Sequence, residues 1–190
     1  MKAFKKRRGG DYQAKMEETE VALISSLVEQ LIELLEVPGE DEPGAEDDDP
    51  FEALARELAD DPDQPEVSED PAVRRLFPDA YPHDPAASSD FRRFTEADQR
   101  RRKIAEAKVV LQALNTTYSG VRPLRVEPDE VTAWLRTLNA LRLTVATRLG
   151  ITDEESAEEL TELPDTDPRA FMYSVYEFLG WMQESLLHVL

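Results

Sequence analysis

Residues 126–152, VEPDEVTAWLRTLNALRLTVATRLGIT, decide the fold. Apolar side chains recur there at steps of three and four residues, which is the spacing of one face of a helix. These residues are Val131, Trp134, Leu135, Leu138, Leu141, Val145 and Leu149. Pro128 suits the first position of a helix, and Gly150 suits the residue after its last turn because glycine tolerates a left-handed backbone. The pattern predicts a buried helix over 128–149 that serves packing rather than chemistry.

The same periodicity predicts further helices along the chain. The main ones are expected over 17–36, over 89–118 and from Pro168 onward, with a short helical turn at 73–77. In the last of these, the apolar residues expected to line the inner face are Phe171, Val175, Phe178, Leu179, Met182, Leu186 and Val189. Thr152 and Glu155 have the spacing of a capping box, which predicts a short acidic helix after the central one.

The first sixteen residues follow a different pattern. Apolar and polar side chains alternate on both sides of Gly9 and Gly10, which predicts a β-hairpin over 2–16. The expected fold is mainly α, a helical bundle of about four main helices with a small N-terminal β-hairpin. We expect one domain over 1–190, in which an acidic insert at 37–70 separates the first helix from a helical body at 71–190.

Composition argues against several kinds of chemistry. The chain has no cysteine, so a disulfide, a thiolate metal site or a thiol nucleophile is excluded. Its two histidines, His83 and His188, lack metal-ligand spacing, and no calcium-loop, phosphate-loop or nucleophile-elbow pattern occurs. We therefore expect a non-enzymatic protein without cofactor or metal. No apolar run is long enough to span a membrane, and no apolar segment follows the basic start, which favours a cytoplasmic protein.

The net charge of −19 is unevenly distributed. Residues 36–70 hold sixteen acids and one arginine among repeated prolines, which predicts a largely disordered insert, except for a possible short helix at 51–58. Residues 1–16 and 92–108 are instead rich in lysine and arginine. The residues predicted to contact a partner or nucleic acid are Lys5, Lys6, Arg7, Arg8, Arg92, Arg93, Arg100, Arg101, Arg102 and Lys103.

Two other interpretations of these basic segments stay open. They can form a solvated face, or the chain's own acidic insert can neutralise them. The second interpretation predicts that deletion of residues 38–68 raises the affinity for DNA or for an acidic partner.

Residues 146–152, ATRLGIT, look like the centre of a helix-turn-helix motif. The following helix, at 153–160, carries five acids and no base, so phosphates would repel it and we reject a DNA-reading role. In the central helix, Asn139 and Arg142 fall close to the apolar stripe. A buried arginine at that position would need a paired carboxylate, and we favour a structural role for it over a binding role.

Several longer tracts resemble one known family. They are RRLFPDAY (74–81), DFRRFTEADQRRRKIAEAKVVLQAL (90–114), WLRTLNALRLTVATRLGIT (134–152) and VYEFLGWMQESLL (175–187). The N-terminal hairpin and first helix match as well. The chain resembles, over nearly its whole length except the acidic insert, an actinobacterial family of unknown-function proteins that includes the actinomycete oxidative-stress transcription regulator.

The resemblance implies a cytoplasmic, stress-response type of transcription regulator that contacts sigma factor or RNA polymerase. It also implies a second possibility, because the family's locus tends to include the adaptor of the Clp protease. We therefore expect a regulator that works through protein contact, with DNA backbone as a weaker partner, or alternatively an adaptor or modulator in Clp-type proteolysis. Sensing through thiols cannot operate in this chain, and homo-oligomerisation is left open.

Overall fold

The computed structural model describes residues 1–36 and 68–190, so the predicted helix at 51–58 and most of the acidic insert lie outside the described residues. The described part is mainly helical with a small sheet, which confirms the expected fold class. The helices are α1 (Glu18–Leu35), α3 (Pro71–Leu76), α4 (Pro85–Asn115), α5 (Val131–Leu149), α6 (Glu154–Thr161) and α7 (Pro168–Leu187). The strands are β1 (Lys5–Lys6), β2 (Tyr12–Ala14) and β3 (Leu124–Val126).

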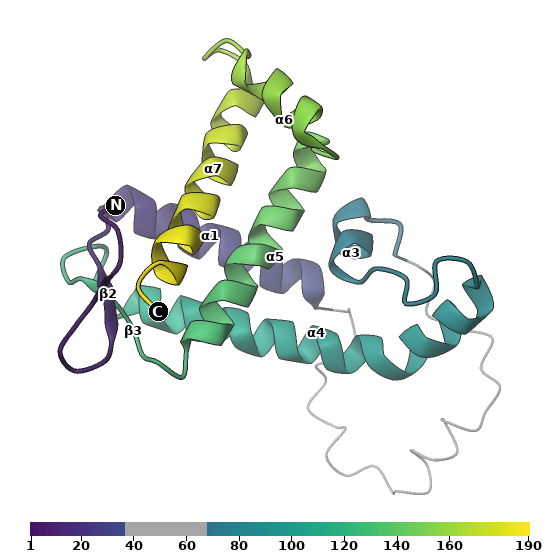
Figure 1. Cartoon of the computed structure of the whole chain (residues 1–190), viewed down its shortest axis with the longest axis horizontal. Helices are drawn as coiled ribbons and strands as arrows, with labels where there is room; N and C mark the ends of the chain where they lie inside the picture. The colour runs from purple at the N-terminus through teal and green to yellow at the C-terminus, as the bar shows by residue number, and fades with distance from the viewer. Residues whose placement is uncertain (37–67) are drawn as a thin grey trace, which may run out of the picture.

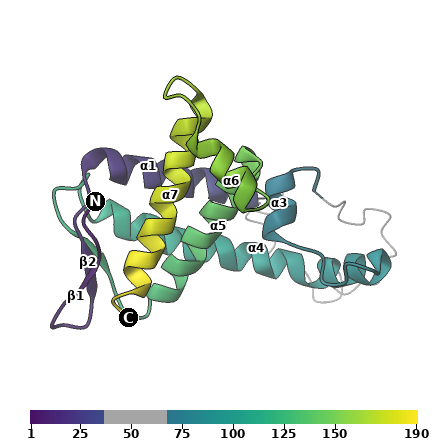
Figure 2. The ribbon, with the colours of Figure 1, turned by 45° about the horizontal axis from the view of Figure 1, so that its top comes forward.

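The four long helices form two crossed pairs. Helices α1 and α4 pack together, and α5 and α7 stand side by side across them (Figure 1). Helix α6 joins the far ends of α5 and α7, and α3 packs beside α5. Turning the molecule shows the sheet at one end of α4, while the opposite end of α4 projects beyond α3 (Figure 2).

Helix α5 is the centre of the core, as its periodicity predicts. The side chains of Trp134 and Leu138 are completely buried, and α1, α3, α4 and α7 all contact the helix. Gly150 ends it with φ at 76°, the left-handed conformation expected there. The predicted start at Pro128 is wrong. The residues just before α5 form a turn, in which the Glu130 amide donates to the Glu127 carbonyl at 3.0 Å.

Capping side chains account for two other shifted boundaries. Helix α4 begins earlier than predicted because Asp84 accepts a hydrogen bond from the Ala87 amide at 3.0 Å, with proline at the first helical position. The capping box of α6 uses Asp153 and Ser156 instead of the expected Thr152 and Glu155.

The inner face of α7 differs from the prediction at Phe171. Its side chain is 62% exposed rather than on the inner face of α7.

The N-terminal hairpin is completed by a strand that the sequence left as an extended link. Strand β3 pairs antiparallel with β2, so that Tyr12 lies opposite Val126 and Ala14 opposite Leu124. Strand β3 contacts α4, and the ring of Phe4, which precedes β1, meets the Trp134 ring of α5 edge-on at 6.4 Å. A hairpin of two short strands is marginal alone, so this packing and the third strand stabilise it.

The loop between α4 and β3 has an unusual backbone. Tyr118 and Ser119 have φ of 50° and 54°, and Gly120 follows with φ of 82°. A Cβ on Gly120 would lie 2.9 Å from the carbonyl oxygen of Met16, which is a backbone atom at the junction of β2 and α1. Glycine is therefore required there for its conformation and for its size.

Replacement of Gly120 by alanine should destabilise the fold more than the same change at Gly10. Gly10 also has a left-handed backbone, with φ of 94°, but a Cβ there would meet no atom within 4 Å. We expect Gly10→Ala to cost about 1 kcal/mol from backbone strain alone, and Gly120→Ala roughly 2–4 kcal/mol. Urea unfolding of both variants measures the difference. Equal losses would contradict the close contact with Met16.

Asp70 links α3 to α5. Its carboxylate accepts a hydrogen bond from the Ala72 amide at 2.8 Å, which caps α3, and pairs with Arg148 of α5 at 2.6 Å. The hydrogen bond from Arg148 and the capping amides hold the pKa of Asp70 below its ordinary value of 3.8. The last residue of the predicted 37–70 insert therefore belongs structurally to the helical body.

The lowered pKa of Asp70 predicts a pH-dependent contribution to stability. A carboxyl whose folded pKa is depressed stabilises the fold above its unfolded pKa and loses that contribution as the pH falls through the folded value. Asp70→Asn should therefore be less stable than the parent at pH 7, and the gap should narrow below about pH 4. Unfolding curves between pH 2 and 7 test this, with the exposed Asp165→Asn as the control substitution.

Candidate contact surfaces

One group of the predicted contact residues lies on the half of α4 that projects beyond α3. Several of these side chains point toward the protein rather than toward solvent. Arg92 and Arg100 have side chains only 12% exposed, and both pair with Glu96, one turn from each. Arg92 also binds Asp79, and Arg100 donates to the Leu35 carbonyl at 3.2 Å. These two arginines hold α4 to its neighbours and are not available as a free positive surface.

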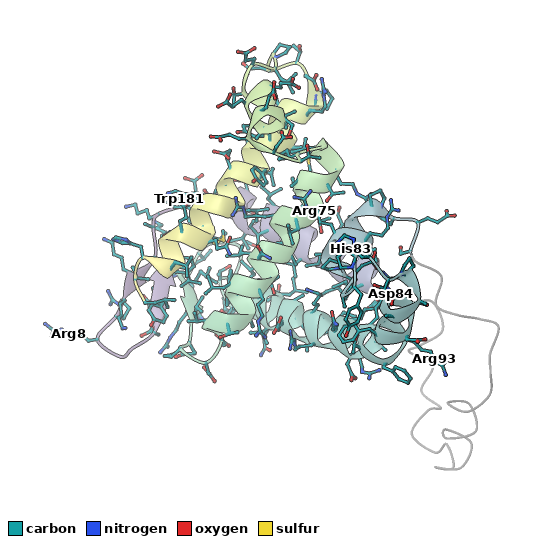
Figure 3. All side chains as sticks on the ribbon, turned by 45° about the vertical axis from the view of Figure 1, so that its right-hand side comes forward. Arg8, Arg75, His83, Asp84, Arg93 and Trp181 are labelled. Carbon is teal, nitrogen blue, oxygen red and sulfur yellow. The ribbon has the colours of Figure 1, made fainter. Side chains whose placement is uncertain are left out.

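Lys103 and Arg93 each lie against an aromatic ring. The Lys103 ammonium is 5.7 Å from the centre of the Phe77 ring, and burial lowers its pKa. The Arg93 guanidinium lies 5.5 Å from the Phe94 ring, at the exposed end of α4 (Figure 3). Both positions favour contact between a cation and an aromatic face.

Arg101 and Arg102 face solvent, as Arg93 does. Arg101 pairs with Asp98, and the Arg102 Nε lies 3.9 Å from a Glu106 oxygen. Both arginine side chains are more than 60% exposed, with values of 69% and 64%. Exposed pairs of this kind contribute little stability, but each places a negative charge beside the positive one.

Substitution should separate the inward arginines from the outward ones. Arg100→Gln removes a largely buried charge pair and leaves Glu96 without one of its two arginines, so we expect a loss of about 1–3 kcal/mol. Arg101→Gln should stay within about 0.5 kcal/mol of the parent. Chemical denaturation of the two variants measures both values. A neutral Arg100→Gln would show that the pair is only a surface contact.

The second predicted group lies on the hairpin and is much less neutralised. Lys5, Arg7 and Arg8 are exposed, and no acid of the described residues lies within ion-pair distance of them. Arg8 extends from the tip of the hairpin away from the body (Figure 3). Lys6 differs from these three residues because its ammonium has contacts within the protein. It lies 5.3 Å from the centre of the Tyr12 ring and donates to the Leu190 carbonyl at 3.3 Å.

The third strand adds residues that the prediction missed. Register places Arg125 beside Gln13 and Lys5, in one row across the sheet, although Arg125 is paired with Asp11 and Glu127. Lys2 and Lys15 are exposed at the same sheet, where their backbones bond to each other. The alternation of apolar, charged and apolar residues at 124–126 was the available signal for this strand.

The loop before β3 contributes a further exposed group. The Arg122 guanidinium stacks 4.4 Å from the centre of the Tyr118 ring, and that ring is 62% exposed. We use the term basic sheet end for Lys2, Lys5, Lys6, Arg7, Arg8, Lys15 and Arg122. The two predicted groups do not meet, because the sheet and the basic half of α4 lie at opposite ends of the molecule (Figures 1 and 2).

Residues 1–36 and 68–190 contain no cluster of three His, Asp or Glu side chains arranged to hold a metal ion. None of the described helices combines the length and the apolar character that a membrane crossing requires. His83 is exposed in the loop that leads to α4, beside Asp84 (Figure 3). The absence of enzymatic activity stays a prediction.

Comparison with known proteins identifies the family to which this chain belongs. The chain belongs to the family described as domain of unknown function (DUF2017), whose model matches residues 1–190. It is 28% identical to the oxidative stress regulator AosR of Mycobacterium tuberculosis, over 100% of this chain and 86% of that protein. AosR of Mycobacterium bovis shows the same identity and coverage. No solved structure matches the chain. The resemblance inferred from the sequence is thereby confirmed.

Proposed function

We propose that this protein is a non-enzymatic regulator of stress-response transcription that works by binding a protein partner through its basic sheet end. The observation that carries the proposal is the contrast between its two basic groups. Those of α4 are paired with acids or lie against aromatic rings, whereas Lys5, Arg7 and Arg8 have no acid partner among the described residues. The name of the mycobacterial relatives supports the regulatory role.

The chemistry of the basic sheet end favours an acidic protein surface as its partner. Its charges lie on a small sheet and on the turn and loop next to it, so a partner meets them without a large cost in ordering the backbone. The chain as a whole carries a net charge of −19, which opposes approach to the uniformly negative DNA duplex. An acidic patch on sigma factor or RNA polymerase is therefore the partner that we propose, with DNA backbone as a secondary contact.

Two matched arginine pairs test the proposal. Arg7→Glu with Arg8→Glu reverses charge at the basic sheet end, and Arg101→Glu with Arg102→Glu makes the same change on α4. We expect the first variant to weaken binding to RNA polymerase holoenzyme by about tenfold or more at low salt, and the second to change it little. Surface-based affinity measurement at several salt concentrations provides the readout, and the binding of the parent should fall as salt rises.

Two outcomes would contradict the proposal. Loss of binding only in the α4 variant would place the contact at the other end of the molecule. Binding to Clp components, with none to polymerase or sigma factor, would replace this function by the proteolytic adaptor role.

A further inference from the structure

Arg142 lies in the seam between α5 and α7, on a face that the other helices leave open. From α5 the seam receives Leu135, Asn139 and Arg142, spaced four and three residues apart. From α7 it receives residues 176, 180, 183 and 187, again on one side of a helix. The two helices stand side by side in front of α1, and Trp181 occupies the opposite flank of α7 (Figures 1 and 3).

The guanidinium of Arg142 is held only by neutral groups. Its terminal nitrogens lie 3.3 Å from the Gln183 side-chain oxygen and 3.3 Å from the Tyr176 hydroxyl. The Tyr176 ring lies 5.0 Å below the guanidinium carbon. The Nε atom is buried and has no hydrogen-bond partner. Both hydrogen bonds are long, so the donors of this side chain are incompletely used.

A glycine in the middle of α7 makes room for this arginine. A Cβ on Gly180 would lie 3.3 Å from the Arg142 Cζ and from one of its terminal nitrogens. Glycine inside a helix destabilises it by about 0.5–1 kcal/mol relative to alanine. The glycine therefore allows the guanidinium to lie flat against the helix backbone, where its position is fixed.

Arg142 also lacks a counter-charge. No carboxylate of the described residues lies within ion-pair distance of it, and its side chain is partly rather than fully buried, so the condition under which a paired carboxylate was expected is not met. The other arginines that join two helices differ in this respect. Arg136 of α5 pairs with Glu106 of α4, and Arg148 pairs with Asp70. A half-buried guanidinium without an acid is costly unless something else completes it.

From this geometry we propose that Arg142 and Tyr176 form a receptor for a carboxylate supplied by a partner polypeptide. The Tyr176 hydroxyl accepts from Arg142, and its own proton is then free to be donated to the same carboxylate. The seam beside them offers two apolar side chains, Leu135 partly exposed and Leu187 50% exposed, next to the polar Asn139 and Gln183. A glutamate or aspartate flanked by apolar residues fits this chemistry, and arginine and tyrosine are enriched at the centres of protein interfaces.

This surface is distinct from the basic sheet end and is independent of the function proposed above. At the sheet, several exposed charges attract a partner over distance, and salt weakens the attraction. At the seam, one fixed guanidinium would bind a single carboxylate at short range, next to apolar side chains. Binding there should therefore depend more on the geometry of the guanidinium than on ionic strength.

The test follows the Arg142 side chain directly by NMR of the full chain labelled with ¹⁵N-arginine. The probes are the peptides acetyl-Leu-Glu-Leu-amide and acetyl-Leu-Gln-Leu-amide, which differ only in the carboxylate. We expect a saturable shift of the Arg142 Nε–H signal with the glutamate peptide, and an affinity at least about fivefold lower for the glutamine peptide.

Two variants keep the positive charge and change its geometry. Arg142→Lys replaces the planar guanidinium, whose N–H groups can bind both oxygens of a carboxylate, by a single ammonium group. Gly180→Ala displaces the guanidinium by a few tenths of an ångström. Both should weaken glutamate-peptide binding severalfold, as followed by tyrosine and backbone signals of the seam, while thermal unfolding shows that the variants remain folded. Equal binding of the two peptides, no shift in the parent, or undiminished binding by folded Arg142→Lys would overturn the proposal and leave Arg142 a packing role on Tyr176.

Discussion

The rest of the structure depends on the burial of α5. Its apolar residues are not confined to a narrow stripe, so α1, α3, α4 and α7 must all pack around it. Trp134 lies at its centre without exposure to solvent and supports the sheet through Phe4. Since removal of apolar surface from water is the main stabilising term, this arrangement fixes where each other element can lie. It leaves two surfaces that we propose as contact sites for partners, the outer face of the sheet and the open seam against α7.

The helices could be predicted because their signals are local. Periodic apolar residues and capping side chains lie within a few residues of each other. Cap choice moved the boundaries at Asp84 and Asp153, and the turn before Val131 moved the start of α5. Strand β3 could not be predicted from its three residues alone, because its pairing partner is more than a hundred positions away. The missing counter-charge of Arg142 is also a non-local property, since it depends on which residues of α7 lie opposite.

The candidate site was predicted only in part, and the reason is electrostatic. A run of arginines identifies positive charge, but it does not show whether the fold neutralises that charge. On α4 the spacing of Arg92, Glu96 and Arg100 already placed one acid within a helical turn of two bases, and this signal was available in the sequence. At the hairpin no such acid occurs at helical or cross-strand spacing except Asp11, which Arg125 engages. The fold thus separates arginines that pair within the molecule from those without an acid partner among the described residues, and the latter are the ones we propose for a partner.

Hydrogen–deuterium exchange of the full chain, alone and with RNA polymerase holoenzyme, tests most directly where the partner binds. If the basic sheet end is the contact surface, amides at residues 2–15 and 122–127 gain protection in the complex, whereas those at 92–103 exchange as in the free protein. Added protection confined to 92–103 would contradict this account, because the arginines assigned to internal pairing would then be the binding residues.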